Sequence, residues 1–83
     1  MPKFLAFHSE PEKTWEELEN AYKKLANETT ARWVRTYYHK DSGRRICEWE
    51  APSDESVIVV FKRMGITWDE LIPVEEILPE RWR

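Results

Sequence analysis

Two strand-like runs around a short polar break form the clearest pattern of apolar and polar positions in the chain. The runs are Arg32–His39 and Arg44–Glu50, and residues 40–43 lie between them. Runs rich in aromatic and β-branched residues, joined by a short loop that contains glycine, predict an antiparallel β-hairpin. Neither run has one clean apolar side, which indicates that both faces of the predicted sheet are at least partly covered.

Strict alternation assigns each hairpin residue to a face of the sheet. In the first run, one face holds Arg32, Val34, Thr36 and Tyr38, and the other holds Trp33, Arg35, Tyr37 and His39. In the second run, Arg45, Cys47 and Trp49 share one face, and Ile46, Glu48 and Glu50 share the other.

A strand and a helix are expected before the hairpin. Lys3–Ser9 is short, apolar and aromatic, which is typical of a strand. Thr14 and Glu17 form a capping box that predicts the start of a helix, which fades near Asn27. The apolar stripe of this helix, at helical spacing, consists of Trp15, Leu18, Tyr22, Leu25 and Ala26.

A helix and a strand are expected after the hairpin. Ser53 is a candidate N-cap and Gly65 a candidate C-terminal stop, and the apolar residues 57–61 between them fit either a helix or a buried strand. The caps favour the helix. Residues 71–78 resemble a final strand, which Pro73 confines to a sheet edge. In the tail, Trp82 is expected to dock on some other surface.

The resulting βαββαβ order predicts an α+β ferredoxin-like sandwich, in which a four-stranded antiparallel sheet carries two helices on one face. Eighty-three residues make a single domain, residues 1–83, whose core is small enough to gain from a partner. We therefore expect a homodimer.

Composition excludes several classes of function. A formal charge of −3 and a pI near 5.4 argue against nucleic-acid binding, which requires a concentrated basic surface. One cysteine cannot form an internal disulfide. The sequence shows neither a signal peptide nor the ~20-residue apolar run of a membrane helix, so a cytoplasmic protein without membrane contact is expected.

Several stretches resemble a known family. They are M-P-K-F-x-x-x-H at the start, R-W-V-R-T-Y in the hairpin, C-x-x-E-A-P from Cys47 to Pro52, and G-I-x-x-D-E-L-I from Gly65 to Ile72. The chain resembles a family of small ferredoxin-like proteins of unknown function that includes nickel-binding members. The resemblance implies a dimer with a metal or small-ligand site, and His8 matches the histidine that ends the family's first strand.

A divalent metal such as nickel is one candidate ligand. His8 with Glu48 or Glu50 on the neighbouring strand could supply nitrogen and oxygen donors, with His8 of a second subunit completing the set. The alternative is that His8 is a strand-end histidine with a local hydrogen bond. No closely spaced pair of histidines or cysteines supports a metal site within one chain.

A pocket for a small ligand is the other candidate. Its expected lining is His8, Tyr22, Trp33, Tyr37 and Trp49. A concave aromatic site with a few polar groups is the usual form of such pockets. The alternative is that these aromatic residues form the core and a dimer interface, which a small domain needs. Cys47, in the middle of a strand, is expected to be a buried hydrophobe and not a nucleophile.

Three functions remain open at this stage. The first is a small binding protein that holds a metal ion or small ligand as a dimer. The second is a cofactor-independent enzyme of the dimeric α/β-barrel type, which rests on fold analogy alone. The third is a structural or interaction subunit.

Overall fold

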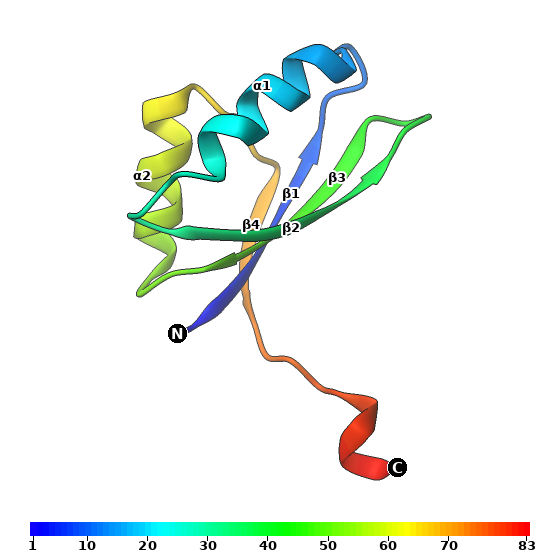
Figure 1. The fold of residues 1–83 in the computed structure, drawn as a ribbon, viewed down its shortest axis with the longest axis vertical. Helices are drawn as coiled ribbons and strands as arrows, with labels where there is room; N and C mark the ends of the chain where they lie inside the picture. Colours follow the sequence, from blue (N-terminus) through cyan, green and yellow to red (C-terminus); the bar gives the residue numbers. More distant parts are fainter.

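The computed structural model describes residues 1–83 and confirms the expected order of elements (Figure 1). The elements are β1 (Lys3–Ser9), α1 (Trp15–Leu25), β2 (Arg32–His39), β3 (Arg44–Glu50), α2 (Asp54–Met64), β4 (Glu70–Val74) and a 3-10 helix η1 (Pro79–Trp82). Neither α1 nor α2 nor η1 combines the length and apolar composition needed to cross a membrane.

The strands form one antiparallel sheet in the order β2-β3-β1-β4. Both helices cover the same face of this sheet (Figure 1). The arrangement is the ferredoxin-like α+β sandwich that the sequence predicts. Since β1 and β3 are the two central strands, their helix-facing residues form the floor of the core.

Local signals place both helices. Thr14 and Glu17 form the expected capping box at the start of α1. Gly65 adopts a left-handed conformation with φ 69° at the end of α2, which settles residues 57–61 as helical. Ser53 precedes α2 as predicted, although its side chain makes no capping hydrogen bond.

The core lies between the helices and the sheet. Trp49 of β3 is fully buried and meets Phe61 of α2 edge-on, with ring centroids 5.5 Å apart. The prediction that Trp15 belongs to the buried stripe of α1 is wrong. Trp15 lies at the start of the helix and stacks on Tyr38 of the edge strand β2, with centroids 6.3 Å apart, and remains mostly exposed.

Some side chains of β2 lie on the face opposite to the one that strict alternation predicts, because the pairing of β2 with β3 shifts by one residue. Trp33 pairs with Trp49, but Arg35 pairs with Glu48, so one residue is extra between them. This β-bulge reverses the alternation after Val34. As a result Trp33, Thr36 and Tyr38 face the helices, whereas Arg35 and Tyr37 face the opposite side.

The side of the sheet opposite the helices, here called the open face, is not covered within one chain (Figure 1). Its centre is a partly exposed apolar strip of Leu5, Phe7, Ile46 and Ile72. Its charged flank consists of ion pairs in which Glu48 and Glu50 bind Lys3, Arg32 and Arg35.

The last strand is shorter than predicted. β4 ends at Val74, and Pro73 lies in an edge strand as expected. Residues 75–78 leave the sheet, and Trp82 is 71% exposed, so the docking expected for Trp82 does not occur on its own domain.

Candidate functional site

A small cavity lies between the sheet and the helices, at the end of the sheet where β1 runs into the loop that leads to α1. His8 of β1 and Arg45 of β3 are cross-strand partners on the helix-covered face, and both are buried. The cavity has a volume of about 30 Å³, and its wall includes His8, Glu10, Tyr22, Arg45, Cys47 and Trp49. That volume is enough for a few water-sized atoms.

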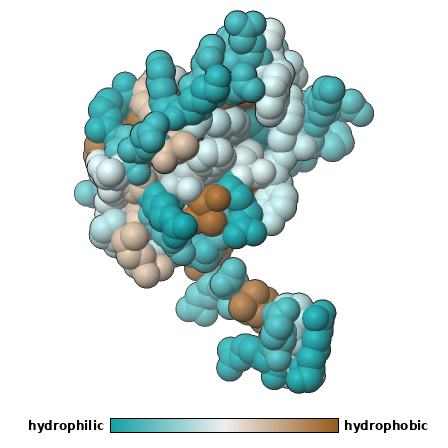
Figure 2. Space-filling view, viewed as in Figure 1, coloured by the Kyte–Doolittle hydropathy of each residue, from teal (hydrophilic) through white to brown (hydrophobic).

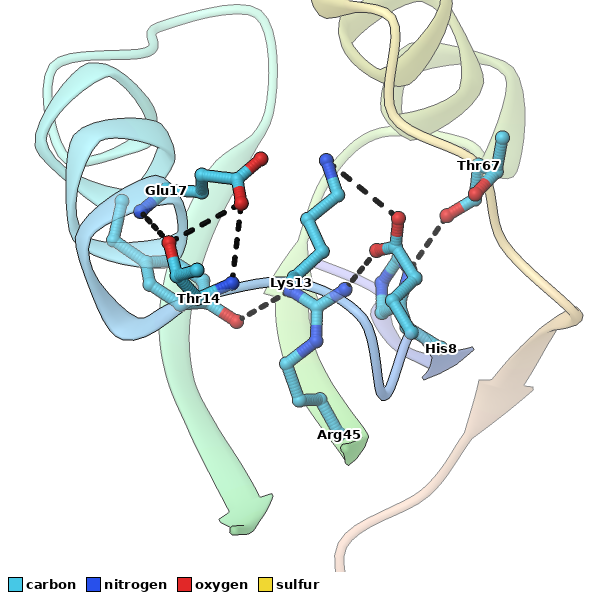
Figure 3. Close-up of polar contacts among 8 residues, drawn as sticks. His8, Lys13, Thr14, Glu17, Arg45 and Thr67 are labelled. Atoms are coloured by element: carbon cyan, nitrogen blue, oxygen red, sulfur yellow. Dashed lines mark hydrogen bonds and ion pairs between the residues drawn. The ribbon is translucent and has the colours of Figure 1, made fainter. Parts of the chain in front are cut away.

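Arg45 is the central charge of this site (Figure 3). Its side chain is 7% exposed and donates from Nη2 to the Glu10 carboxylate and from Nη1 to the Tyr22 hydroxyl, 3.0 Å away. Lys13 Nζ lies 3.7 Å from the other oxygen of Glu10. The Nε atom of Arg45 is buried and has no hydrogen-bond partner.

Trp49 supplies a second buried donor without a partner. Its indole Nε1 is enclosed and unbonded, although the residue is fully buried. Buried N–H groups are almost always hydrogen-bonded, because leaving one unpaired costs about 1–3 kcal/mol. Both Arg45 and Trp49 line the cavity, and neither of these two donors has a hydrogen-bond partner.

His8 is held in one tautomer. Its Nδ1 lies 2.8 Å from the Thr67 carbonyl oxygen, which can only accept, so Nδ1 carries the proton and Nε2 keeps its lone pair (Figure 3). Burial lowers the pKa of His8, and the positive charge of Arg45 acts in the same direction. His8 is therefore a neutral imidazole at pH 7 that can accept a hydrogen bond or bind a metal through Nε2.

The pH dependence of stability tests this account of His8. Because the folded pKa lies below the unfolded value of 6.5, the unfolded chain binds more protons as the pH falls through this range. The free energy of unfolding should therefore decrease from about pH 7.5 to about pH 5.5, by at most about 1.4 kcal/mol per pH unit for one proton. Urea denaturation of the wild type and of His8→Asn, whose amide keeps a donor toward Thr67, measures this contribution.

The His8→Asn variant should lose stability less steeply with falling pH than the wild type. His39→Asn, a substitution of the exposed histidine at the end of β2, is the matched control and should follow the wild-type curve. Parallel curves for all three proteins would show that His8 is not buried as a neutral imidazole.

Tyr22 connects the cavity to a chain of polar contacts behind it. Its ring stacks on Trp33, with centroids 4.8 Å apart, and its hydroxyl lies 3.9 Å from Cys47 Sγ. Trp33 Nε1 donates to Thr36 Oγ1 at 2.8 Å, and Thr36 Oγ1 donates to Cys47 Sγ at 3.1 Å. Burial raises the pKa of the Cys47 thiol, which disfavours the thiolate that a nucleophile requires.

The structure brings together only part of the ligand pocket expected from the sequence. His8, Tyr22 and Trp49 line the cavity, and Trp33 lies behind Tyr22. Tyr37 is on the open face and is 62% exposed, because the bulge in β2 separates its face from that of Trp33.

The structure does not bring together the metal donors expected from the sequence. His8 points to the helix side, whereas Glu48 and Glu50 lie on the open face in ion pairs with basic residues. No group of three His, Cys, Asp or Glu side chains in the chain is arranged to hold a metal ion. Within one chain, therefore, the residues around His8 do not fit a nickel ion.

Sequence reasoning missed two residues of the site. Arg45 could have been found, because alternation puts it on the same face as the buried Cys47 and Trp49. Glu10 carried no such signal, since it lies in a loop beside Pro11 and reaches Arg45 only through the tertiary fold.

Fold and site together define a small ferredoxin-like α+β protein with a small, mostly apolar cavity under its first helix, into whose wall a buried arginine and histidine are built. The family described as "Nickel responsive protein SCO4226-like" matches residues 4–74, and the chain belongs to this family. The resemblance noted in the sequence is thereby confirmed.

One solved structure is similar to the chain in fold. It is SCO4226 from Streptomyces coelicolor A3(2), with a TM-score of 0.76 and 24% sequence identity, and the match covers 92% of this chain and 99% of that one. A search of curated proteins found no match.

Proposed function

We propose that the chain is a non-enzymatic binding protein that takes up a small ligand with acceptor oxygens in the cavity over Arg45. The observation that carries this proposal is the pair of buried donors without partners, Arg45 Nε and Trp49 Nε1. A carboxylate suits them best, because hydrogen bonds from a guanidinium to a carboxylate are charge-assisted. With room for only a few atoms, the cavity admits a ligand of the size of formate or acetate.

The other groups of the cavity support binding more than catalysis. The Cys47 thiol is protonated and bonded to Thr36, and the Glu10 carboxylate is engaged by both Arg45 and Lys13. A cofactor-independent enzyme would need a nucleophile or base that is free to react. Of the cavity groups, only the Nε2 atom of His8 is such a group, so we favour a binding role over the enzyme.

Nickel binding is the second candidate, and the family match favours it. His8 Nε2 could serve as one ligand, since its Nδ1 proton is anchored on a carbonyl as in most metal-bound histidines. One chain supplies no complete donor set. A nickel site would therefore require donors from a second subunit.

We also propose that the functional unit is a homodimer, supported by the uncovered apolar strip on the open face. An uncovered sheet face of this kind commonly marks an interface. A purely structural subunit, the third function considered, would use the same face without needing the cavity. The cytoplasmic location inferred from the sequence stays a prediction.

Ligand-induced stabilisation tests the binding proposal. The thermal midpoint should rise with formate or acetate at constant ionic strength, because a ligand that binds only the folded state stabilises it by RT ln(1 + [L]/Kd). Three or four heavy atoms allow a Kd of about 1 mM, given at most about 1.5 kcal/mol per atom. Arg45→Lys should abolish the rise, since lysine has no Nε–H at that position.

Arg44→Lys is the matched control, because Arg44 is the exposed neighbour on the open face, and it should respond like the wild type. The same assay with nickel separates the second candidate. A midpoint that rises with nickel in the wild type but not in His8→Ala would favour nickel over the carboxylate. A chain that responds to none of these ligands would overturn the binding proposal.

A further inference from the structure

The last nine residues form an arm that stands clear of the domain. This C-terminal arm, residues 75–83, leaves the sheet after β4 and ends in the 3-10 helix η1 (Figure 1). In the space-filling view it stands apart from the body and carries hydrophobic surface (Figure 2). Its large apolar side chains, Ile77, Leu78 and Trp82, are 72%, 45% and 71% exposed.

The hydrogen bonds and ion pairs of the arm lie within the arm itself, and only the charge of Glu76, near the start of the arm, acts on Arg35 of the open face. The Arg81 amide donates to the Leu78 carbonyl at 3.2 Å, Arg83 pairs with Glu80 at 3.8 Å, and the Arg81 guanidinium lies 5.8 Å from the Trp82 ring centre. One such turn is not stable in water without packing. The radius of gyration of 13.4 Å also exceeds the about 12 Å of a compact domain of this length.

The same chain carries a surface that complements the arm. The open face has the apolar strip of Leu5, Phe7, Ile46 and Ile72 at its centre. Of its basic side chains, Arg32 and Arg35 are paired with Glu50 and Glu48, and Arg44 is exposed beside the strip. The arm combines apolar residues with the acids Glu75, Glu76 and Glu80. The apolar groups of the two surfaces therefore match, and Arg44 offers a partner for an acid of the arm.

We propose that the arm is exchanged between two copies of this chain, so that each arm packs Ile77, Leu78 and Trp82 on the open face of the other subunit. This inference rests on the homodimer proposed above and names the segment that forms it. The arm runs away from its own sheet beyond the end of β4, which favours the face of a second copy (Figure 1).

Symmetry and area are consistent with this exchange. In a two-fold dimer each subunit gives one arm and receives one, so the contact occurs twice. A buried Trp contributes on the order of 150–250 Å². Two arms, with the sheet surface that they cover, supply a large part of the roughly 1,200–2,000 Å² of a stable interface. A membrane is a poor alternative, because the arm has three acids against two arginines and no basic cluster.

Sedimentation velocity of the full chain tests the exchange. The wild type should be a dimer, and Ile77→Ser combined with Trp82→Ser should raise the dimer dissociation constant by at least about tenfold, because hot-spot aromatics dominate interfaces. Both residues are exposed in the subunit, so folding should be unchanged. Trp15→Ser, which removes another exposed tryptophan, on the helix side, is the matched control and should remain dimeric.

A dimer that the arm substitutions leave intact would overturn the exchange but not the homodimer. A wild-type chain that stays monomeric at every concentration would overturn both. Mixed dimers of isotope-labelled and unlabelled chains give a second measurement. Contacts between the Trp82 ring and the Ile46 methyls should be seen between chains, and contacts within one chain alone would also contradict the exchange.

Discussion

Replacing Gly43 with alanine should destabilise the protein by about 3 kcal/mol or more. Gly43 has φ +72°, where a side chain is strained, and a Cβ there would lie 2.4 Å from the Cα of Pro11. The contact is with backbone, so a side-chain movement cannot relieve it. The thermal midpoint of the purified variant measures the effect.

Gly65→Ala is the matched control, because Gly65 has φ +69° but nothing within 4 Å of its Cβ position. It should cost about 1–2 kcal/mol, the strain of the left-handed conformation alone. The midpoint of Gly43→Ala should therefore lie about 5 °C or more below that of Gly65→Ala. Equal midpoints would mean that the loop at Pro11 does not pack on the hairpin.

The Gly43 contact also matters for the cavity. The Glu10 amide donates to the Gly43 carbonyl at 3.2 Å, so the hairpin turn holds the loop that carries Glu10. Glu10 in turn binds Arg45. The turn between β2 and β3 thus holds Glu10 in place beside Arg45, although the turn itself does not line the cavity.

Replacing Glu10 with glutamine should destabilise the protein by about 2 kcal/mol or more. The substitution leaves the Arg45 guanidinium, whose side chain is 7% exposed, without its carboxylate partner. Removing one member of a buried ion pair costs about 3–5 kcal/mol, and the partial exposure of Glu10 reduces this. Urea denaturation at pH 7 measures the loss.

Glu12→Gln, in the same loop but exposed, is the matched control and should change stability by less than about 0.5 kcal/mol. Glu10→Gln should also bind formate more tightly than the wild type, because the substitution removes a negative charge that repels the anion beside Arg45. A Glu10→Gln protein as stable as Glu12→Gln would show that Arg45 does not depend on this pair.

The fold was predictable because its signals are local. The capping box at Thr14, the left-handed Gly65 and the glycine-containing hairpin turn each depend on a few adjacent residues. The position of Cys47 in the middle of a strand also predicted its burial correctly. Such features do not depend on the rest of the chain.

The features that were not predictable depend on pairing between strands. The bulge after Trp33 is visible only once β2 is aligned with β3, and it moved Tyr37 away from the expected pocket. The register of β1 against β3 places His8 and Glu48 on opposite faces of the sheet. The expected metal site required both residues on one face. The exposure of Trp82 was not predictable from the tail itself, because it depends on the edge strand β4 ending at Val74.

The most direct test of the central claim is the indole N–H resonance of Trp49 in a two-dimensional NMR spectrum, assigned by its loss in Trp49→Phe. Titration with formate should move this signal saturably in the wild type and in Arg44→Lys, and should leave it unmoved in Arg45→Lys. Sodium chloride should hold the ionic strength constant without moving it. A Trp49 signal that does not move with formate in the wild type would contradict the claim that the cavity binds a carboxylate.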